Sequence, residues 1–235
     1  MIKFFRKIRK NMLTENKLGK YLIYAFGEII LVIIGILIAL GINNQSRKKD
    51  DNNLFKSYIA QLNDEAEANL KNLNDHKDES IKILTELDTL IKILVNKEYE
   101  NPKLLSKSIY IISGNSFNPI TITHENLKFS GDLKLFEDLN LRNSISETYD
   151  SFNDIKFIED LDRELINVYT QDYLMSNARF MNMTESSDNF GKDAYFENSV
   201  IARITTLSKN REAYENAIES LTKLTIIFSE LQNDN

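Results

Sequence analysis

Residues 21–42 read YLIYAFGEIILVIIGILIALGI, and this stretch decides the architecture of the chain. As an α-helix these 22 residues measure about 33 Å, enough to cross a hydrocarbon core of about 30 Å. Fourteen of them are Leu, Ile, Val or Phe, which together favour insertion by about 4–8 kcal/mol. Glu28, the one charged residue, opposes insertion by at most about 3 kcal/mol. The sequence therefore predicts a transmembrane helix over 21–42.

Charged residues are divided unevenly between the two sides of this segment. Residues 1–42 hold seven basic and two acidic side chains, whereas the other 193 residues hold 22 basic and 33 acidic ones, a net charge of −11. The positive-inside rule places the N-terminus in the cytoplasm and residues 43–235 outside the membrane. We therefore expect a single-pass protein of the bacterial inner membrane with a periplasmic C-terminal domain. A domain this acidic is a poor candidate for binding nucleic acid.

The N-terminal tail, 1–20, has an apolar face of its own. Between basic residues, four apolar residues recur at intervals of three or four: Ile2, Phe5, Ile8 and Met12. This pattern is typical of an amphipathic helix on an anionic leaflet, and a solvated tail is the alternative. Two alternatives also stay open for the span. One is a buried core helix, and the other is a signal peptide cleaved at the small residues of Ala39–Gly41.

Two motifs resemble an uncharacterised bacterial family of single-span membrane proteins. The first is the run Tyr21–Val32 with Gly35–Leu40, and the second is the element Leu-x-x-Ser-Gly-x-Leu at Leu127–Leu133. The resemblance implies one span, a basic N-terminus and a helical C-terminal domain, and it implies no activity, cofactor or catalytic residue. Family members continue with Asn-Trp-Asn-Glu after the span, whereas Asn43–Ser46 here reads NNQS, so a role for that Trp does not carry over.

Small residues share one face of the predicted span with Glu28. At 100° per residue, Gly35 and Ala39 fall within about 20° of Glu28, and Tyr24 lies on the same side. A carboxyl group in line with small residues is the pattern of a helix–helix interface in lipid. We expect self-association, or docking against another membrane protein, along this face. The alternative is a Glu28 side chain that reaches the headgroups of the bilayer.

Beyond the span the apolar residues keep a helical period. From Phe55 to Leu94 they recur every three or four residues, with a polar interruption at Asn74–Asp78. Pro102 must end this helix, because proline disfavours helix at the residue before it. We expect a shorter helical segment over 103–113 and a loop near 114–122.

The remaining residues predict two more long helices. Thr123 is the expected N-cap of a short helix that Gly131 ends, and a long helical pattern then runs from Leu139 to Phe180. A turn is expected near 184–192. The last helix has the most regular seam, with residues at alternating steps of three and four: Ile204, Leu207, Arg211, Tyr214, Ile218 and Leu221, continued by Thr225 and Phe228.

These elements predict an all-α protein in which one N-terminal transmembrane helix is followed by an elongated antiparallel helical bundle with coiled-coil-like packing. The expected domains are the tail 1–20, the span 21–42 and the extracytoplasmic bundle 43–235. With 7 Gly and 2 Pro in 235 residues, the chain lacks the turn formers that a β-sandwich or barrel requires.

The search for chemistry finds no motif of a hydrolase, nucleotide-binding or metalloprotein family. There is no Cys, and the two histidines, His76 and His124, are not expected to form a site. The acidic groups Asp64/Glu65/Glu67 and Glu159/Asp160/Asp162 are interpreted as solvated helix faces. Six aromatic residues are interpreted mainly as core, with a ligand pocket as the alternative: Tyr149, Phe152, Phe157, Tyr169, Tyr173 and Phe180. We predict no catalytic residue, metal or cofactor.

Two functions are compatible with these patterns. The first is a non-catalytic, membrane-anchored interaction or scaffold protein that self-associates or docks a membrane partner, because the span and the last helix both carry association patterns. The alternative is a helical extracytoplasmic sensor that binds a small ligand and signals through a separate partner, since the cytoplasmic part has about 20 residues.

Overall fold

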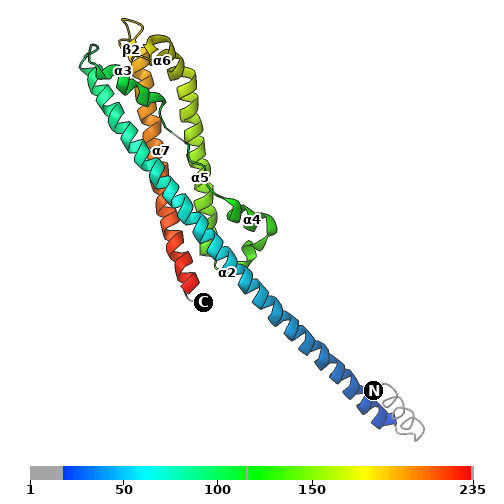
Figure 1. Cartoon of the computed structure of the whole chain (residues 1–235). Helices are drawn as coiled ribbons and strands as arrows, with labels where there is room; N and C mark the ends of the chain where they lie inside the picture. The colour runs from blue at the N-terminus through cyan, green and yellow to red at the C-terminus, as the bar shows by residue number, and fades with distance from the viewer. Residues whose placement is uncertain (1–17, 115, 234–235) are drawn as a thin grey trace. The chain divides into compact units, whose positions relative to one another are not determined.

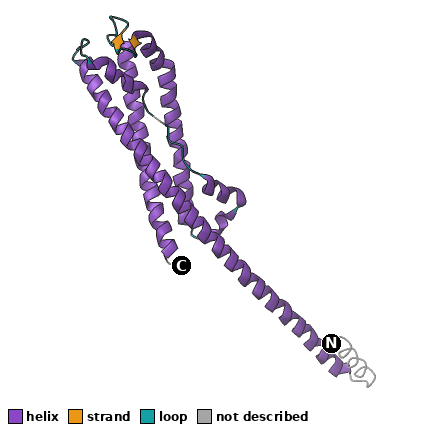
Figure 2. Cartoon of the chain, in the orientation of Figure 1, coloured by secondary structure: helices purple, strands orange, loops and turns teal. Residues whose placement is uncertain are grey.

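The computed structural model describes residues 18–114 and 116–233, so the tail 1–17 lies outside the described residues. The described chain is helical except for short connections and one pairing of two-residue strands (Figure 2). This confirms the predicted all-α fold. The elements form two compact units, residues 1–54 and 55–235, which are described separately.

Helix α2, Leu18–Val95, contributes to both units. It is continuous through Asn74–Asp78, so the polar interruption in the sequence does not break it. It ends in a Schellman motif, in which the Glu98 N–H donates to the Ile93 carbonyl and Lys97 takes the left-handed conformation at φ 56°. In the first unit, the leucine, isoleucine and valine side chains of residues 29–42 are exposed. This part of α2 is long and apolar enough to cross a membrane, as predicted.

The second unit contains the C-terminal half of α2 and the remaining elements (Figure 1). In chain order these are α3 (Lys103–Ser108), the 3-10 helix η1 (Ile109–Ile112), α4 (Ile122–Ser130), the 3-10 helix η2 (Asp132–Leu135), α5 (Leu139–Leu165), the π-helix η3 (Ile166–Thr170), α6 (Gln171–Asn177), β1 (Ala178–Arg179), β2 (Thr184–Glu185) and α7 (Ala194–Asn233).

The second unit is a bundle of α2, α5 and α7, which lie side by side (Figure 1). Helices α2 and α5 run in the same direction, and α7 runs antiparallel to both. The parallel pair is possible because the chain returns along the bundle after η1, through residues 113–114 and 116–123. We call these residues the crossing segment.

The core of the bundle consists of two hydrophobic clusters with a polar layer between them. One cluster contains Leu62 and Leu73 of α2, and the other contains Leu87 and Leu90 of the same helix. All four side chains are fully buried. The polar stretch Asn74–Asp78 lies between these two pairs in the sequence, so it interrupts the core without interrupting the helix.

Local signals explain most helix ends. The Asp138 carboxylate accepts a hydrogen bond from the Asn140 N–H at 2.8 Å and caps α5, and Gly131 ends α4 at φ 74°, as predicted. Thr123 is not the N-cap of α4: the N-cap is Thr121, two residues earlier, and the helix begins at Ile122. The long helical pattern ends at Asn177, so Phe180 lies in the hairpin loop and not in a helix.

Candidate functional site

Buried polar side chains from the long helices hold the crossing segment by its backbone. At its start, the Arg203 guanidinium donates to the Ser113 carbonyl. The Phe117 N–H then donates to both oxygens of the Glu159 carboxylate, at 3.0 and 3.1 Å. Arg203 belongs to α7 and Glu159 to α5.

Helix α2 holds the second half of the crossing segment. The Asn69 amide makes two hydrogen bonds to Ile120, donating to its carbonyl at 2.7 Å and accepting from its N–H at 2.8 Å. The Glu65 carboxylate accepts from the Thr123 N–H at 2.8 Å. This last bond satisfies a backbone N–H in the first turn of α4, where the N-cap residue Thr121 makes no side-chain cap. These helix side chains satisfy backbone groups that the packed segment cannot satisfy with a neighbouring strand or with bulk water.

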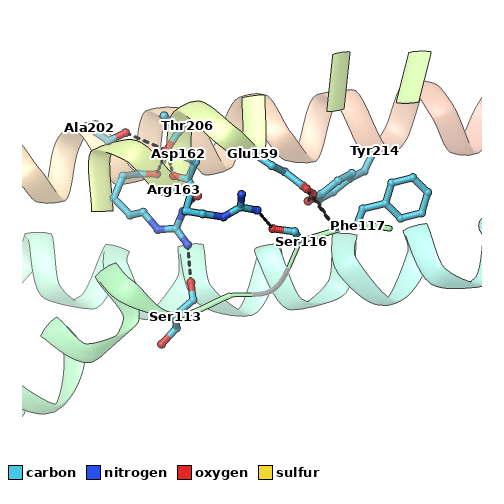
Figure 3. Close-up of polar contacts among 10 residues, drawn as sticks. Ser113, Ser116, Phe117, Glu159, Asp162, Arg163, Ala202, Thr206 and Tyr214 are labelled. Carbon is cyan, nitrogen blue, oxygen red and sulfur yellow. Dashed lines mark hydrogen bonds and ion pairs between the residues drawn. The ribbon is translucent and has the colours of Figure 1, made fainter. Parts of the chain in front are cut away.

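The polar layer is centred on Arg203 and Asp162. Figure 3 shows Asp162 beside Thr206. The Arg203 guanidinium forms an ion pair with the Asp162 carboxylate, which also accepts from the Thr206 hydroxyl. Arg203 is 4% exposed. Burial lowers the pKa of Arg203 to about 10, which still leaves the guanidinium charged at neutral pH.

A second polar pair lies next to the first along the bundle (Figure 3). The Tyr214 hydroxyl donates to the Glu159 carboxylate. Burial raises the pKa of Glu159 above its ordinary value, and the hydrogen bonds from Tyr214 and from the Phe117 N–H partly oppose this rise. Burial and the bond to Glu159 raise the pKa of the Tyr214 hydroxyl.

These contacts correct one interpretation of the sequence. Glu65, Glu159 and Asp162 were interpreted as part of solvated helix faces, and this was wrong, because all three are at most 7% exposed. Their neighbours Asp64, Glu67 and Asp160 are exposed, as expected. A carboxylate tolerates burial when hydrogen bonds replace its hydration, and the crossing segment supplies backbone N–H donors to two of the three.

The two histidines are not on a solvated surface. The His76 ring is half-buried, with its centroid 6.1 Å from the Phe117 ring and 6.0 Å from the Tyr214 ring. The His124 ring is buried and stacks on the Tyr149 ring with 4.3 Å between centroids. Burial, and then the charge of Lys128, lowers the pKa of His124, so its neutral form is favoured.

Two hollows adjoin the crossing segment. A cavity of about 80 Å³ lies in the polar layer, where Arg203 Nε and Asn210 Oδ1 make no hydrogen bond to any described residue. This volume has room for ordered water, and the unpaired polar atoms would bond to it. A wider groove of about 860 Å³ lies on the other side of the segment, between α4 and α5, with His124, Lys128 and Lys156 among its lining residues.

The arrangement favours a structural role for the buried ionisable groups. Glu159 and Asp162 accept hydrogen bonds from fixed donors, and neither is positioned as an unengaged base. Over residues 18–114 and 116–233, no group of three or more His, Asp or Glu side chains could hold a metal ion.

The predicted interface residues of the span belong to the first unit. Glu28 is half-buried, and Gly35 and Ala39 are exposed. Apart from the neighbouring residues and the adjacent backbone of the helix itself, no described atom lies within 4 Å of a Cβ placed on Gly35. Tyr24 lies in the helix, but its side chain is outside the described ones.

The predicted seam of α7 divides into two sets. Leu207, Tyr214 and Leu221 are buried, whereas Ile204, Arg211 and Ile218 are half-buried beside them. Four further buried positions each lie one residue before a half-buried position of the seam: Arg203, Asn210, Ala217 and Leu224. A heptad search that allowed polar residues at core positions would have found Arg203 and Asn210, since both keep the spacing of three and four.

The aromatic residues of the third helical pattern also divide. Tyr149 and Phe152 are buried in the core, and Tyr173 and Phe180 pack against the second cluster. Phe157 and Tyr169 are exposed. Packing therefore accounts for four of the six.

Comparison with protein-family models, with curated proteins and with solved structures finds no match. The resemblance to a family of single-span membrane proteins, drawn from the two sequence motifs, therefore stays a prediction.

Proposed function

We propose that this chain is a non-catalytic scaffold protein of the bacterial inner membrane, with its N-terminus in the cytoplasm and its bundle in the periplasm. The observation that supports anchoring is the exposure of the apolar side chains between residues 29 and 42, which in water would be strongly unfavourable. A lipid bilayer removes this cost.

The polar layer supports a platform rather than an enzyme. Glu159 and Arg203, together with Glu65 of α2, are used to fix the crossing segment against three helices. Such a network gives the bundle one defined arrangement, which suits a protein that presents a surface to a partner.

The expected self-association along the Glu28 face can be tested with cysteines, because the chain has none of its own. An Ala39→Cys variant places a thiol on that face, and Leu37→Cys places one on the opposite side of the helix. In oxidised native membranes, Ala39→Cys should form disulfide-linked dimers and Leu37→Cys should not. Adding Glu28→Leu should weaken dimer formation by Ala39→Cys. Equal crosslinking at both positions would contradict an interface on this face.

Orientation needs its own experiment. A reporter enzyme that is active only in the periplasm, fused after Asn235, should be active in intact cells. A fused reporter that is active only in the cytoplasm would refute the proposed topology without affecting the bundle.

A sensor is the second candidate, and the observation in its favour is the groove of about 860 Å³ beside the crossing segment, within the size range of ligand sites. A ligand that binds there should stabilise the bundle, so a thermal-shift screen of the full-length protein against metabolites distinguishes the two functions. A clear stabilisation supports the sensor. A screen without any stabilisation favours the scaffold.

A further inference from the structure

The groove of about 860 Å³ beside the crossing segment has three walls. Helix α4 forms one wall, α5 forms another, and residues 116–119 and Thr121 of the crossing segment form the third. The sensor alternative uses this groove, and the side chains of its walls restrict the chemistry of the ligand that it can bind.

Four buried aromatic rings line the groove and contact one another in series. The His124 ring stacks on Tyr149 with 4.3 Å between centroids, Tyr149 meets Phe152 at 5.4 Å, and Phe152 meets Phe117 at 5.5 Å. Each of the four residues is 4% exposed. Their mutual packing therefore fixes the shape of the groove, and the surface for contact with a ligand must come from other residues.

Phe129 supplies such a surface. It belongs to the α4 wall and is 89% exposed, so the bundle does not pack against its ring. An aromatic ring in water gains free energy when another apolar surface covers it, and aromatic pairs prefer offset-stacked or edge-to-face contact. This wall therefore favours a ligand with an aromatic group.

The groove also has charged side chains of both signs that are not yet used. Among the residues that the structure describes, none forms a hydrogen bond or ion pair with the side chains of Lys128, Lys156 or Asp150. The other charged residues of the lining already have partners within the protein: Glu125, Glu159, Asp160 and Arg163.

These three free charges restrict the charge of the ligand. A simple anion would be attracted by the two lysines and repelled by Asp150, and a simple cation would meet the reverse. A molecule that has both charges can satisfy all three side chains.

We propose that this groove binds a small zwitterion, an amino acid with an aromatic side chain, whose carboxylate faces Lys128 and Lys156, whose ammonium group faces Asp150, and whose ring packs against Phe129. The volume lies within the range of small-molecule sites. The inference rests on the sensor alternative, whose groove it uses, and adds the class of ligand.

The test measures the binding of 4-fluoro-L-phenylalanine to full-length protein in phosphatidylcholine nanodiscs, from the broadening of its ¹⁹F signal. Two analogues each lack one charge: 3-(4-fluorophenyl)propanoate has no ammonium group, and 2-(4-fluorophenyl)ethylamine has no carboxylate. Empty nanodiscs give the broadening that partitioning into lipid causes. The zwitterion should bind wild-type protein about fivefold more tightly than either analogue, the change expected for one lost ion pair at an exposed site.

Charge variants test each contact separately. Lys128→Gln, Lys156→Gln and Asp150→Asn should each weaken binding of 4-fluoro-L-phenylalanine about threefold. Asp150→Asn should bind the propanoate analogue at least as tightly as wild type, because the lost carboxylate only repels that analogue. Lys209→Gln and Asp154→Asn are the controls, since they change the net charge equally at exposed positions outside the groove and should leave binding unchanged.

The ring contact has its own matched pair of variants. Phe129→Ala should weaken binding about fivefold. Phe157→Ala removes an exposed ring that does not line the groove and should leave binding unchanged. Because the substituted side chains are all exposed, the variants should keep the fold, which circular dichroism checks.

Three results would each overturn the proposal. Wild-type protein would broaden the 4-fluoro-L-phenylalanine signal no more than empty nanodiscs do, all three probes would bind alike, or the control variants would lose as much binding as the groove variants. The sensor alternative can survive such a result. A thermal-shift screen that finds a stabilising ligand of another charge type would support the sensor and refute the zwitterion.

Discussion

The apolar segment 29–42 and the polar layer of the bundle place opposite kinds of side chain in unfavourable surroundings. In the first, Leu31 is 73% exposed and Leu37 is 60% exposed. In the second, a cation and carboxylates are almost fully buried. Under the proposed anchoring, the first arrangement depends on a lipid solvent outside the protein, whereas the second depends on hydrogen-bond geometry inside it. The two regions should therefore respond to different perturbations.

The largest effect is expected in the span. Replacing Ile34 and Leu37 together by Arg should oppose insertion by about 6–8 kcal/mol, the sum of two central arginines and two lost apolar side chains. This offsets the whole favourable term of the segment. Carbonate extraction of membranes should leave wild-type protein in the pellet and release the double variant, whereas Ile34→Leu with Leu37→Ile should behave as wild type. Retention of the arginine variant would argue against a lipid-embedded segment.

The ion pair of the polar layer should give the next largest effect. Arg203→Met leaves the Asp162 carboxylate buried without its cation, which should lower the free energy of unfolding by about 3–5 kcal/mol. Urea titration followed by circular dichroism measures this change. Lys223→Met is the control, because the pair of Lys223 with Glu219 is exposed and should contribute less than about 1 kcal/mol.

A double variant sharpens the interpretation of that result. Adding Asp162→Leu to Arg203→Met removes the uncompensated charge, so much of the lost stability should return. No recovery would mean that the cost comes from the hydrogen bond between Arg203 and the Ser113 carbonyl, or from packing, and not from the buried charge.

The difference between these regions also explains how much of the molecule could be predicted. The span follows from composition alone, since fourteen apolar side chains outweigh Glu28 whatever the rest of the chain does. A helix end such as that at Gly131 is local and depends on a few neighbouring residues. These features could be predicted because their causes lie close together in the sequence.

The polar layer could not be predicted, because its causes are far apart. Glu65 and Glu159 have the same local pattern as the exposed Asp64 and Asp160 beside them. What buries them is the crossing segment, which reaches Glu159 from 42 residues away and Glu65 from 58 residues away. A single sequence gives no measure of such a pairing, so the solvated interpretation was the reasonable expectation and was still wrong.

The two hydrogen bonds between Asn69 and Ile120 of the crossing segment should contribute less to stability than the ion pair. Asn69→Ala leaves the Ile120 N–H and carbonyl without their partners and should lower the free energy of unfolding by about 2 kcal/mol. Hydrogen exchange at the Ile120 amide should accelerate as well. Asn74→Ala is the control, since that amide bonds only to Leu70 and Lys77 of its own helix, and it should stay within about 0.5 kcal/mol of wild type. Unchanged exchange at Ile120 would show that packing alone holds the segment.

The smallest effect concerns the pH dependence of the bundle. Burial lowers the pKa of His124 in the folded state, so the unfolded chain binds the proton first as the pH falls through about 6.5, and stability is lost below that value. The slope for one proton is at most about 1.4 kcal/mol per pH unit. His124→Phe keeps the stacking on Tyr149 and forfeits no hydrogen bond of Nε2 to a described residue. As the pH falls from 7 to 5, the His124→Phe variant should therefore gain stability relative to wild type. Above pH 7 the difference between the two proteins should change little. The raised pKa of Glu159 acts equally in both proteins, so it cancels from the difference in stability between variant and wild type. If that difference stayed constant from pH 7 to pH 5, the burial of a neutral His124 would be contradicted.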